Sequence, residues 1–429
     1  MPLEILLALF VAATAAAPQP APDVRVALVD KQLGGEAEEA LALVDASLDV
    51  DGARSRTRGF DYLRGHLLLE TGQHAEAMEA FAATLGSTPD LAPWARLELA
   101  RAQAAGGDAE VAAGLVATLL GEGPPRVLVD DAVSLLEETL AAGGDCRLLG
   151  GLGRLRLGDA ERRILELTRA HCDWRGGEQA SARERWLDLL RADAGDDVAL
   201  RAAELLASDA AAPESFENRL ALGMAFYEHR EFDRSAPLLN QALVQAPSDA
   251  GTYELRYALA RSYFWLRRYE AAARAFAALA ADAADAGRRS RALYQRARSL
   301  ELHGETRWPE ASAAFQATYA AQPRGRFAAA ALIARLRLAW LRGDFEAASG
   351  ALDQLRRHRK WTQVSSGLLF LASSELLSGR TEGVAEWLAE ARRLGRLPAA
   401  EIDYWRGRLA ESVGDLDRAT ELYAAVAAA

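Results

Sequence analysis

Alternating runs of valine, isoleucine and threonine are almost absent from this chain of 429 residues, which excludes an extensive β-sheet. After the first 17 residues no stretch holds 18 uninterrupted apolar residues, so we expect no transmembrane segment in the mature chain. Aromatic residues make up only 7% of the sequence, and alanine dominates the hydrophobic half. Because alanine has the highest helix propensity, this composition predicts an all-α protein.

The usual sequence signatures of catalysis are also missing. The glycine-rich stretch 150–153 lies between predicted helices and does not follow a strand, so it is not a phosphate loop. The six histidines form no pair with metal-ligand spacing, and the only cysteines, Cys146 and Cys172, form no CxxC motif. We therefore expect no catalytic residue, no metal and no cofactor.

The charge of −11 is divided unevenly along the chain. Residues 1–210 hold 35 acidic and 20 basic residues, whereas residues 211–429 hold 26 acidic and 30 basic residues. The acidic half argues against nucleic acid as a partner, because such binding needs a basic footprint. The basic half could face an anionic polymer, and the alternative is an ordinary solvated helical surface.

The N-terminus predicts export. Residues 3–17 are apolar apart from Glu4 and Thr14 and contain the cleavage-like sequence Ala13-Thr14-Ala15, and residues 18–22 are rich in proline and alanine. We predict a signal peptide over 1–17, a mature start over 18–22 and a periplasmic location, with a cytoplasmic one as the alternative. An oxidising compartment would permit a disulfide between Cys146 and Cys172; the alternative is two buried thiols on neighbouring helices.

The strongest positive signal is self-similarity at a period of about 34 residues. Small residues, a large residue and a final proline recur at fixed offsets. Examples are Gly65, Gly72, Ala77, Phe81 and Pro89 in one unit and Gly223, Phe232, Ala242 and Pro247 in another. These offsets resemble those of the tetratricopeptide repeat, in which small residues lie where paired helices touch.

The repeats predict an α/α solenoid in two arrays, 23–212 and 213–429, whose stacked helix pairs create a concave groove. The shortage of lysine and asparagine excludes a co-chaperone that grips carboxylates with those residue types. Tryptophan could instead stack on sugars, and arginine could pair with carboxylates, in the C-terminal array. The candidate ligand-binding residues are Arg335, Arg337, Trp340, Arg356, Arg357, Trp405 and Arg406; the alternative is that they pack or cap helices.

The order of short segments resembles the α-superhelical N-terminal region of bacterial soluble lytic murein transglycosylases. The segments are 91–97 (LAPWARL), 144–146 (GDC), 307–311 (RWPEA) and 403–409 (DYWRGRL). The resemblance implies a periplasmic role in peptidoglycan turnover, with glycan strands or protein partners in the groove. The family's catalytic glutamate precedes serine in a longer motif, and neither Glu214-Ser215 nor Glu411-Ser412 has that continuation.

The final residues 415–429 read as the second helix of a repeat without a stop signal. From the sequence we therefore expect an array that ends in the middle of a repeat, as in a fragment of a longer enzyme. Two functions remain: a non-catalytic scaffold of the transglycosylase type, and a generic adaptor that binds proteins.

Overall fold

The computed structural model describes residues 36–57, 59–154, 157–209, 215–247 and 251–429. Within these residues the chain forms 22 α-helices and no β-strand, which confirms the prediction of an all-α solenoid of tetratricopeptide-like helix pairs. No helix of the described part is long and apolar enough to cross a membrane. The expected signal peptide (1–17) and mature start (18–22) lie outside the described residues.

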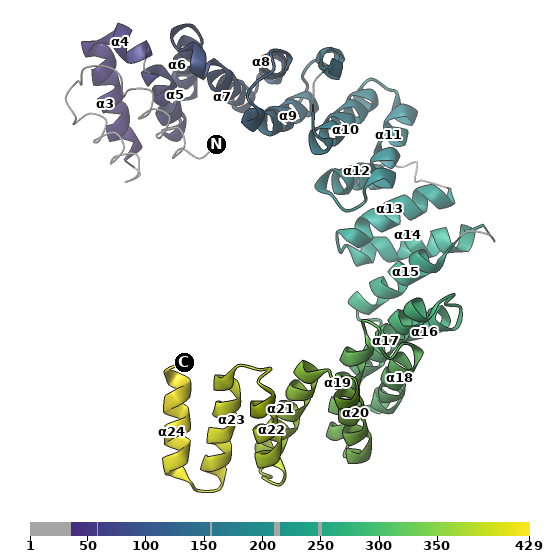
Figure 1. The fold of residues 1–429 in the computed structure, drawn as a ribbon. Coiled ribbons are helices and arrows are strands. Elements are labelled where there is room, and N and C mark those ends of the chain that lie inside the picture. Colours follow the sequence, from purple (N-terminus) through teal and green to yellow (C-terminus); the bar gives the residue numbers. More distant parts are fainter. Residues whose placement is uncertain (1–35, 58, 155–156, 210–214, 248–250) are drawn as a thin grey trace. The chain divides into compact units, whose positions relative to one another are not determined.

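The chain packs as two units, residues 1–212 and 213–429. Each unit is a series of helices in which every helix packs against the next one along the chain (Figure 1). The helices of the first unit are α3 (Ala37–Val50), α4 (Gly52–Thr57), α5 (Phe60–Glu70), α6 (His74–Ser87), α7 (Ala92–Ala105), α8 (Ala109–Gly121), α9 (Arg126–Ala141), α10 (Asp159–Arg175), α11 (Gln179–Ala192) and α12 (Asp197–Ser208), with 3-10 helices η1 (Pro89–Leu91) and η2 (Cys146–Arg154).

The second unit contains six helix pairs. In each pair we call the earlier helix the first helix and the later one the second helix. The helices are α13 (Phe216–Glu228), α14 (Phe232–Gln245), α15 (Tyr253–Trp265), α16 (Tyr269–Ala281), α17 (Ala286–His303), α18 (Trp308–Ala321), α19 (Ala328–Leu341), α20 (Phe345–Arg357), α21 (Trp361–Leu377), α22 (Val384–Leu394), α23 (Ala399–Ser412) and α24 (Leu416–Ala427), with η3 (Glu305–Arg307) before α18.

Glycine brings the paired helices into close contact. A Cβ atom on Gly65 would lie 2.6 Å from the Phe81 ring, and one on Gly407 would lie 2.7 Å from the Tyr423 ring. At Gly223 the added Cβ would lie 2.7 Å from Cδ2 of Leu239 and 3.2 Å from its backbone nitrogen. In each case the large residue comes 16 positions after the glycine, so the sequence offsets correspond to one packing contact that recurs along the chain.

Because of this contact, we expect Gly223→Ala to lower the free energy of unfolding by about 1–3 kcal/mol through overpacking. Gly350 in α20 is the matched control, since a Cβ there meets nothing within 4 Å. Gly350→Ala should raise stability by about 0.5–1 kcal/mol, because alanine loses less conformational entropy in a helix. Urea unfolding followed by far-UV circular dichroism measures both, and two changes of the same sign would contradict the packing argument.

The segment between α8 and α10 does not form a regular helix pair, because helix α9 is followed there by the 3-10 helix η2. η2 packs on α8 and α10, and its first residue, Cys146, forms a disulfide with Cys172 of α10, with the two Cα atoms 5.8 Å apart. The two cysteines are therefore bonded and are not the pair of free buried thiols that the sequence also allowed. The disulfide fixes the short 3-10 element where a second helix would otherwise complete the repeat.

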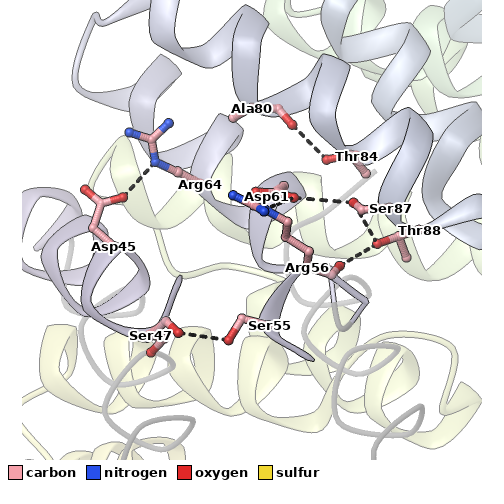
Figure 2. Close-up of polar contacts among 10 residues, drawn as sticks. All are labelled: Asp45, Ser47, Ser55, Arg56, Asp61, Arg64, Ala80, Thr84, Ser87 and Thr88. Carbon is pink, nitrogen blue, oxygen red and sulfur yellow. Dashed lines mark hydrogen bonds and ion pairs between the residues drawn. The ribbon is translucent and has the colours of Figure 1, made fainter. Parts of the chain in front are cut away.

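Polar contacts hold the short helix α4 between α3 and the pair formed by α5 and α6 (Figure 2). The Ser55 hydroxyl donates to the Ser47 carbonyl at 2.9 Å, and the Thr88 hydroxyl donates to the Arg56 carbonyl at 2.7 Å. The Arg64 guanidinium donates to Asp45 at 2.7 Å. Together with the buried residues of α3 and α5, these contacts attach the first helices to the repeat array.

Candidate functional site

Arginine and tyrosine side chains converge on the first helices of the second unit. They surround an open cleft of about 700 Å³, to which α13, α15, α17 and the turn between α18 and α19 contribute. We call it the arginine cleft and define it by Glu254, Tyr257, Arg261, Arg288, Arg291 and Arg326.

Helical and repeat spacing together create the cleft. Glu254, Tyr257 and Arg261 are three and four residues apart, so they share one face of α15. Arg288, Arg291 and Gln295 follow 34 residues later and occupy the equivalent face of α17. Since equivalent positions of stacked repeats lie side by side, the two rows form one continuous wall.

The charge of the cleft is strongly positive. Four guanidinium groups line it, and the only carboxylate in its lining is that of Glu254. Glu254 lies 3.2 Å from Arg291, and Arg261 donates to the amide oxygen of Gln295 at 3.3 Å. Outside the lining, Asp285 lies 3.8 Å from Arg288. Because two carboxylates cannot neutralise four guanidinium groups, the cleft favours an anionic ligand.

Tyrosine rings hold two of the guanidinium groups in place. The guanidinium carbon of Arg291 lies 3.6 Å from the ring centre of Tyr257, which is 5% exposed, and that of Arg288 lies 4.9 Å from Tyr253. Burial lowers the pKa of Arg291, but Tyr257 and Glu254 raise it by more, so its pKa is above the ordinary value. A stacked arginine is preorganised and loses little freedom when it forms a bidentate contact.

Two further arginines occupy turns where the other repeats have glycine. Arg230 and Arg267 adopt positive φ angles of 64° and 58°, whereas the equivalent turn residues Gly72, Gly107 and Gly343 have φ angles of 77°, 87° and 75°. The left-handed conformation costs a non-glycine residue about 1 kcal/mol. Arg230 and Arg267 directly follow α13 and α15, the helices that contribute to the cleft. The Arg230 guanidinium lies 5.2 Å from the centre of the Trp265 ring.

This arrangement suits the binding of an anion. Planar guanidinium groups donate paired hydrogen bonds to carboxylate or phosphate oxygens, and the aromatic rings offer apolar contact. Within the described residues, no group of three histidine, cysteine, aspartate or glutamate side chains could hold a metal ion.

The residues proposed from the sequence lie elsewhere and are not brought together. On α19, Arg335 donates to Gln316 at 2.9 Å, and Arg337 donates to Glu301 at 3.2 Å. The Trp340 ring packs 4.6 Å from Phe345 and 5.5 Å from Trp387. None of the three lines the arginine cleft.

The remaining four candidates lie on α20 and α23. Arg356 forms two hydrogen bonds with Glu390, at 2.7 and 3.2 Å, while Arg357 is exposed and donates to the backbone oxygen of Asp353. Trp405 packs against the core cluster of α19 to α23, and Arg406 pairs with Asp403 at 2.9 Å. Intramolecular partners therefore occupy most of these side chains.

In two smaller hollows of the first unit, arginines are paired with carboxylates of the protein itself. One, of about 520 Å³, contains Arg101, which pairs with Glu98 at 2.8 Å and with Asp131 at 2.9 Å. The other, of about 450 Å³, lies along α10 and α11, and its Arg185 pairs with Glu166 and Asp173. We therefore take the arginine cleft as the candidate site.

The sequence indicates this cleft only when the repeats are aligned, because the residues that line it are far apart along the chain. Aligning the repeats at 34 residues places Tyr227, Arg261 and Gln295 in one row and Glu254 and Arg288 in another. Polar residues at first-helix positions of successive repeats would have indicated a shared surface.

No family model and no curated protein matches the sequence. The chain is similar to the solved structure of the APC/C hetero-tetramer Cut9-Hcn1, at 16% identity over 99% of this chain and 81% of that chain, with a TM-score of 0.27. It is also similar to Naa15/Naa10 bound to HypK, at 16% identity over 93% and 69%, with a TM-score of 0.39, and to yeast Tom70, at 11% identity over 94% and 83%, with a TM-score of 0.34. At these values the similarity carries no argument about function, and nothing in it links the chain to lytic transglycosylases.

Proposed function

We propose that this chain is a non-catalytic adaptor that binds a carboxylate-bearing segment of a partner protein in the arginine cleft. The observation that carries the proposal is the convergence of four guanidinium groups with a single carboxylate in an open cleft. Peptide segments often dock in grooves with an apolar wall and a few charged groups that fix their orientation. Tyr227 and Phe327 supply apolar surface, and Arg288 and Arg326 supply exposed charge.

The test is the binding of a labelled hexaglutamate peptide, with hexalysine as the probe of opposite charge, measured by fluorescence polarisation. We expect saturable binding of hexaglutamate only. The double variant Arg288→Glu and Arg326→Glu should weaken it at least about 100-fold, since hydrogen bonds to charged groups contribute about 1.5–3 kcal/mol each.

The double variant Arg268→Glu and Arg274→Glu is the matched control, because it makes the same charge change at two exposed arginines that do not line the cleft. It should weaken binding much less than the cleft variant does. Equal binding of both peptides, or equal effects of the cleft variant and the control, would refute the proposal.

A second candidate is the periplasmic scaffold in peptidoglycan turnover that the sequence resemblance implies. The disulfide between Cys146 and Cys172 favours it, because disulfides persist in oxidising compartments such as the periplasm. Sedimentation with purified peptidoglycan tests this candidate. Retention at low salt supports it, and a protein that stays in the supernatant at low salt excludes it.

A further inference from the structure

Arginines recur at the connections between successive helix pairs of the second unit. The first turn of α17 and the connections before α19, α21 and α23 each carry at least one exposed arginine, and Arg357 and Arg393 lie in the helix ends that precede two of these connections. We call this set the basic edge and define it by Arg289, Arg324, Arg357, Arg359, Arg393 and Arg396. Arg289, Arg324 and Arg359 are spaced by 35 residues, which is close to the repeat period.

Contacts between neighbouring repeats place these connections along one side of the unit. The Tyr253 hydroxyl, at the start of α15, donates to the backbone oxygen of Arg288 at 2.9 Å. Further along, Tyr319 near the end of α18 lies 2.6 Å from the Nε2 atom of His358, in the connection before α21. The basic edge begins at the arginine cleft, because Arg288 of the cleft directly precedes Arg289 in α17 and Arg326 follows Arg324 by two residues.

The basic edge has no counter-charges of its own. Among the described residues, no carboxylate lies within 4 Å of any of its six guanidinium groups. By contrast, Arg356 and Arg392, each next to a member of the basic edge in the sequence, are paired with Glu390 and Asp403. A row of unpaired cations at repeat spacing is a surface that attracts an extended anion.

We propose that the basic edge continues the arginine cleft and binds an extended acidic segment of the partner protein; this inference rests on the proposed function of the cleft. A polypeptide is narrow enough to follow one row of side chains. A nucleic acid duplex or an anionic membrane is wider than this row and would also face the 26 acidic residues of 211–429, which repel it.

The length of the segment follows from helix packing. Neighbouring helices lie about 10 Å apart, so the six steps from α17 to α23 span at most about 60 Å. An extended chain covers about 3.3 Å per residue, so a segment of about 18 residues reaches from the cleft to the connection before α23.

The experiment compares labelled glutamate peptides of six and 18 residues on the full chain at low salt. We expect the longer peptide to bind about 30-fold more tightly, from several exposed ion pairs of modest strength each. The triple variant Arg324→Ser, Arg357→Ser and Arg396→Ser should remove that gain and leave the six-residue peptide unaffected.

The control variant, Arg268→Ser, Arg274→Ser and Arg342→Ser, removes the same charge from exposed arginines outside the basic edge and should retain the gain. If the short peptide binds and the long one binds no better, or if both triple variants lose the gain equally, the inference is wrong while the proposed function stands. If neither peptide binds, the proposed function itself fails. A DNA hairpin that displaces the long peptide at equal concentration would overturn the choice of a protein partner.

Discussion

Breaking the disulfide between Cys146 and Cys172 should lower the free energy of unfolding of the first unit by about 3.5 kcal/mol. The two cysteines are 26 residues apart, and a cross-link that closes a loop of this length reduces the entropy of the unfolded chain by about that amount. The loop contains η2, so this element should lose protection first. The double variant Cys146→Ser and Cys172→Ser should behave like the reduced protein.

Native-state amide hydrogen exchange measures the effect separately in each unit. Peptides from α8 to α10 should exchange faster after reduction. Peptides from α15 to α18 should not change, because the second unit contains no cysteine. Unchanged exchange in α8 to α10 would show that η2 and its neighbours are held by packing alone.

The first unit should also lose stability in acid through His66. Burial, the largest cause, lowers the pKa of this imidazole to about 4, from an ordinary value of 6.5, and Arg101 lowers it further against the opposing effect of Glu70. The ring packs 4.7 Å from Tyr62 and 5.4 Å from Phe81, and its buried Nε2 atom has no hydrogen-bond partner. A proton on His66 therefore has no acceptor in the folded state.

The unfolded chain binds the His66 proton more tightly than the folded chain does, so acid favours unfolding. Between pH 6.5 and about 4 the unfolded chain is protonated at this position and the folded chain is not. The free energy of unfolding should fall across this range by at most about 3 kcal/mol and should change no further below it on account of His66.

Replacing His66 by phenylalanine keeps an aromatic ring between Tyr62 and Phe81 and removes the proton site. We expect this variant to lose the acid-dependent component between pH 6.5 and 4 in urea unfolding series. His74→Gln, at an exposed position at the start of α6, is the control and should retain it. A His66→Phe variant with the original pH profile would assign that component to carboxylates instead.

Much of the fold could be predicted from the sequence because one contact repeats. Gly65 with Phe81 and Gly223 with Leu239 have the same spacing, so a local pattern encodes a local helix pair. The segment that follows α9 could not be predicted in the same way. η2 is stabilised by contacts with α8 and α10 and by a cysteine 26 residues away, and no periodic signal marks such contacts.

The candidate site was harder to predict, because it depends on contacts between neighbouring repeats. The run of basic residues at 356–360 stands out in the sequence, yet Arg356 is paired with Glu390, 34 residues away. Arg291 is unremarkable in the sequence but is stacked on Tyr257 of the preceding repeat. Whether an arginine is paired or available depends on the neighbouring repeat, so it can be predicted only after the repeats have been aligned.

The turns at Arg230 and Arg267 are positions where the charge of the array can change while its helices stay the same. Each turn joins the two helices of a pair, and its left-handed residue is glycine in some repeats and arginine in others. Exchanging one for the other alters the charge at a corner of the array for about 1 kcal/mol, with every helix left as it was. A lineage or a protein engineer could therefore retune the electrostatics of one repeat at a time, and the helical framework would not have to evolve with it.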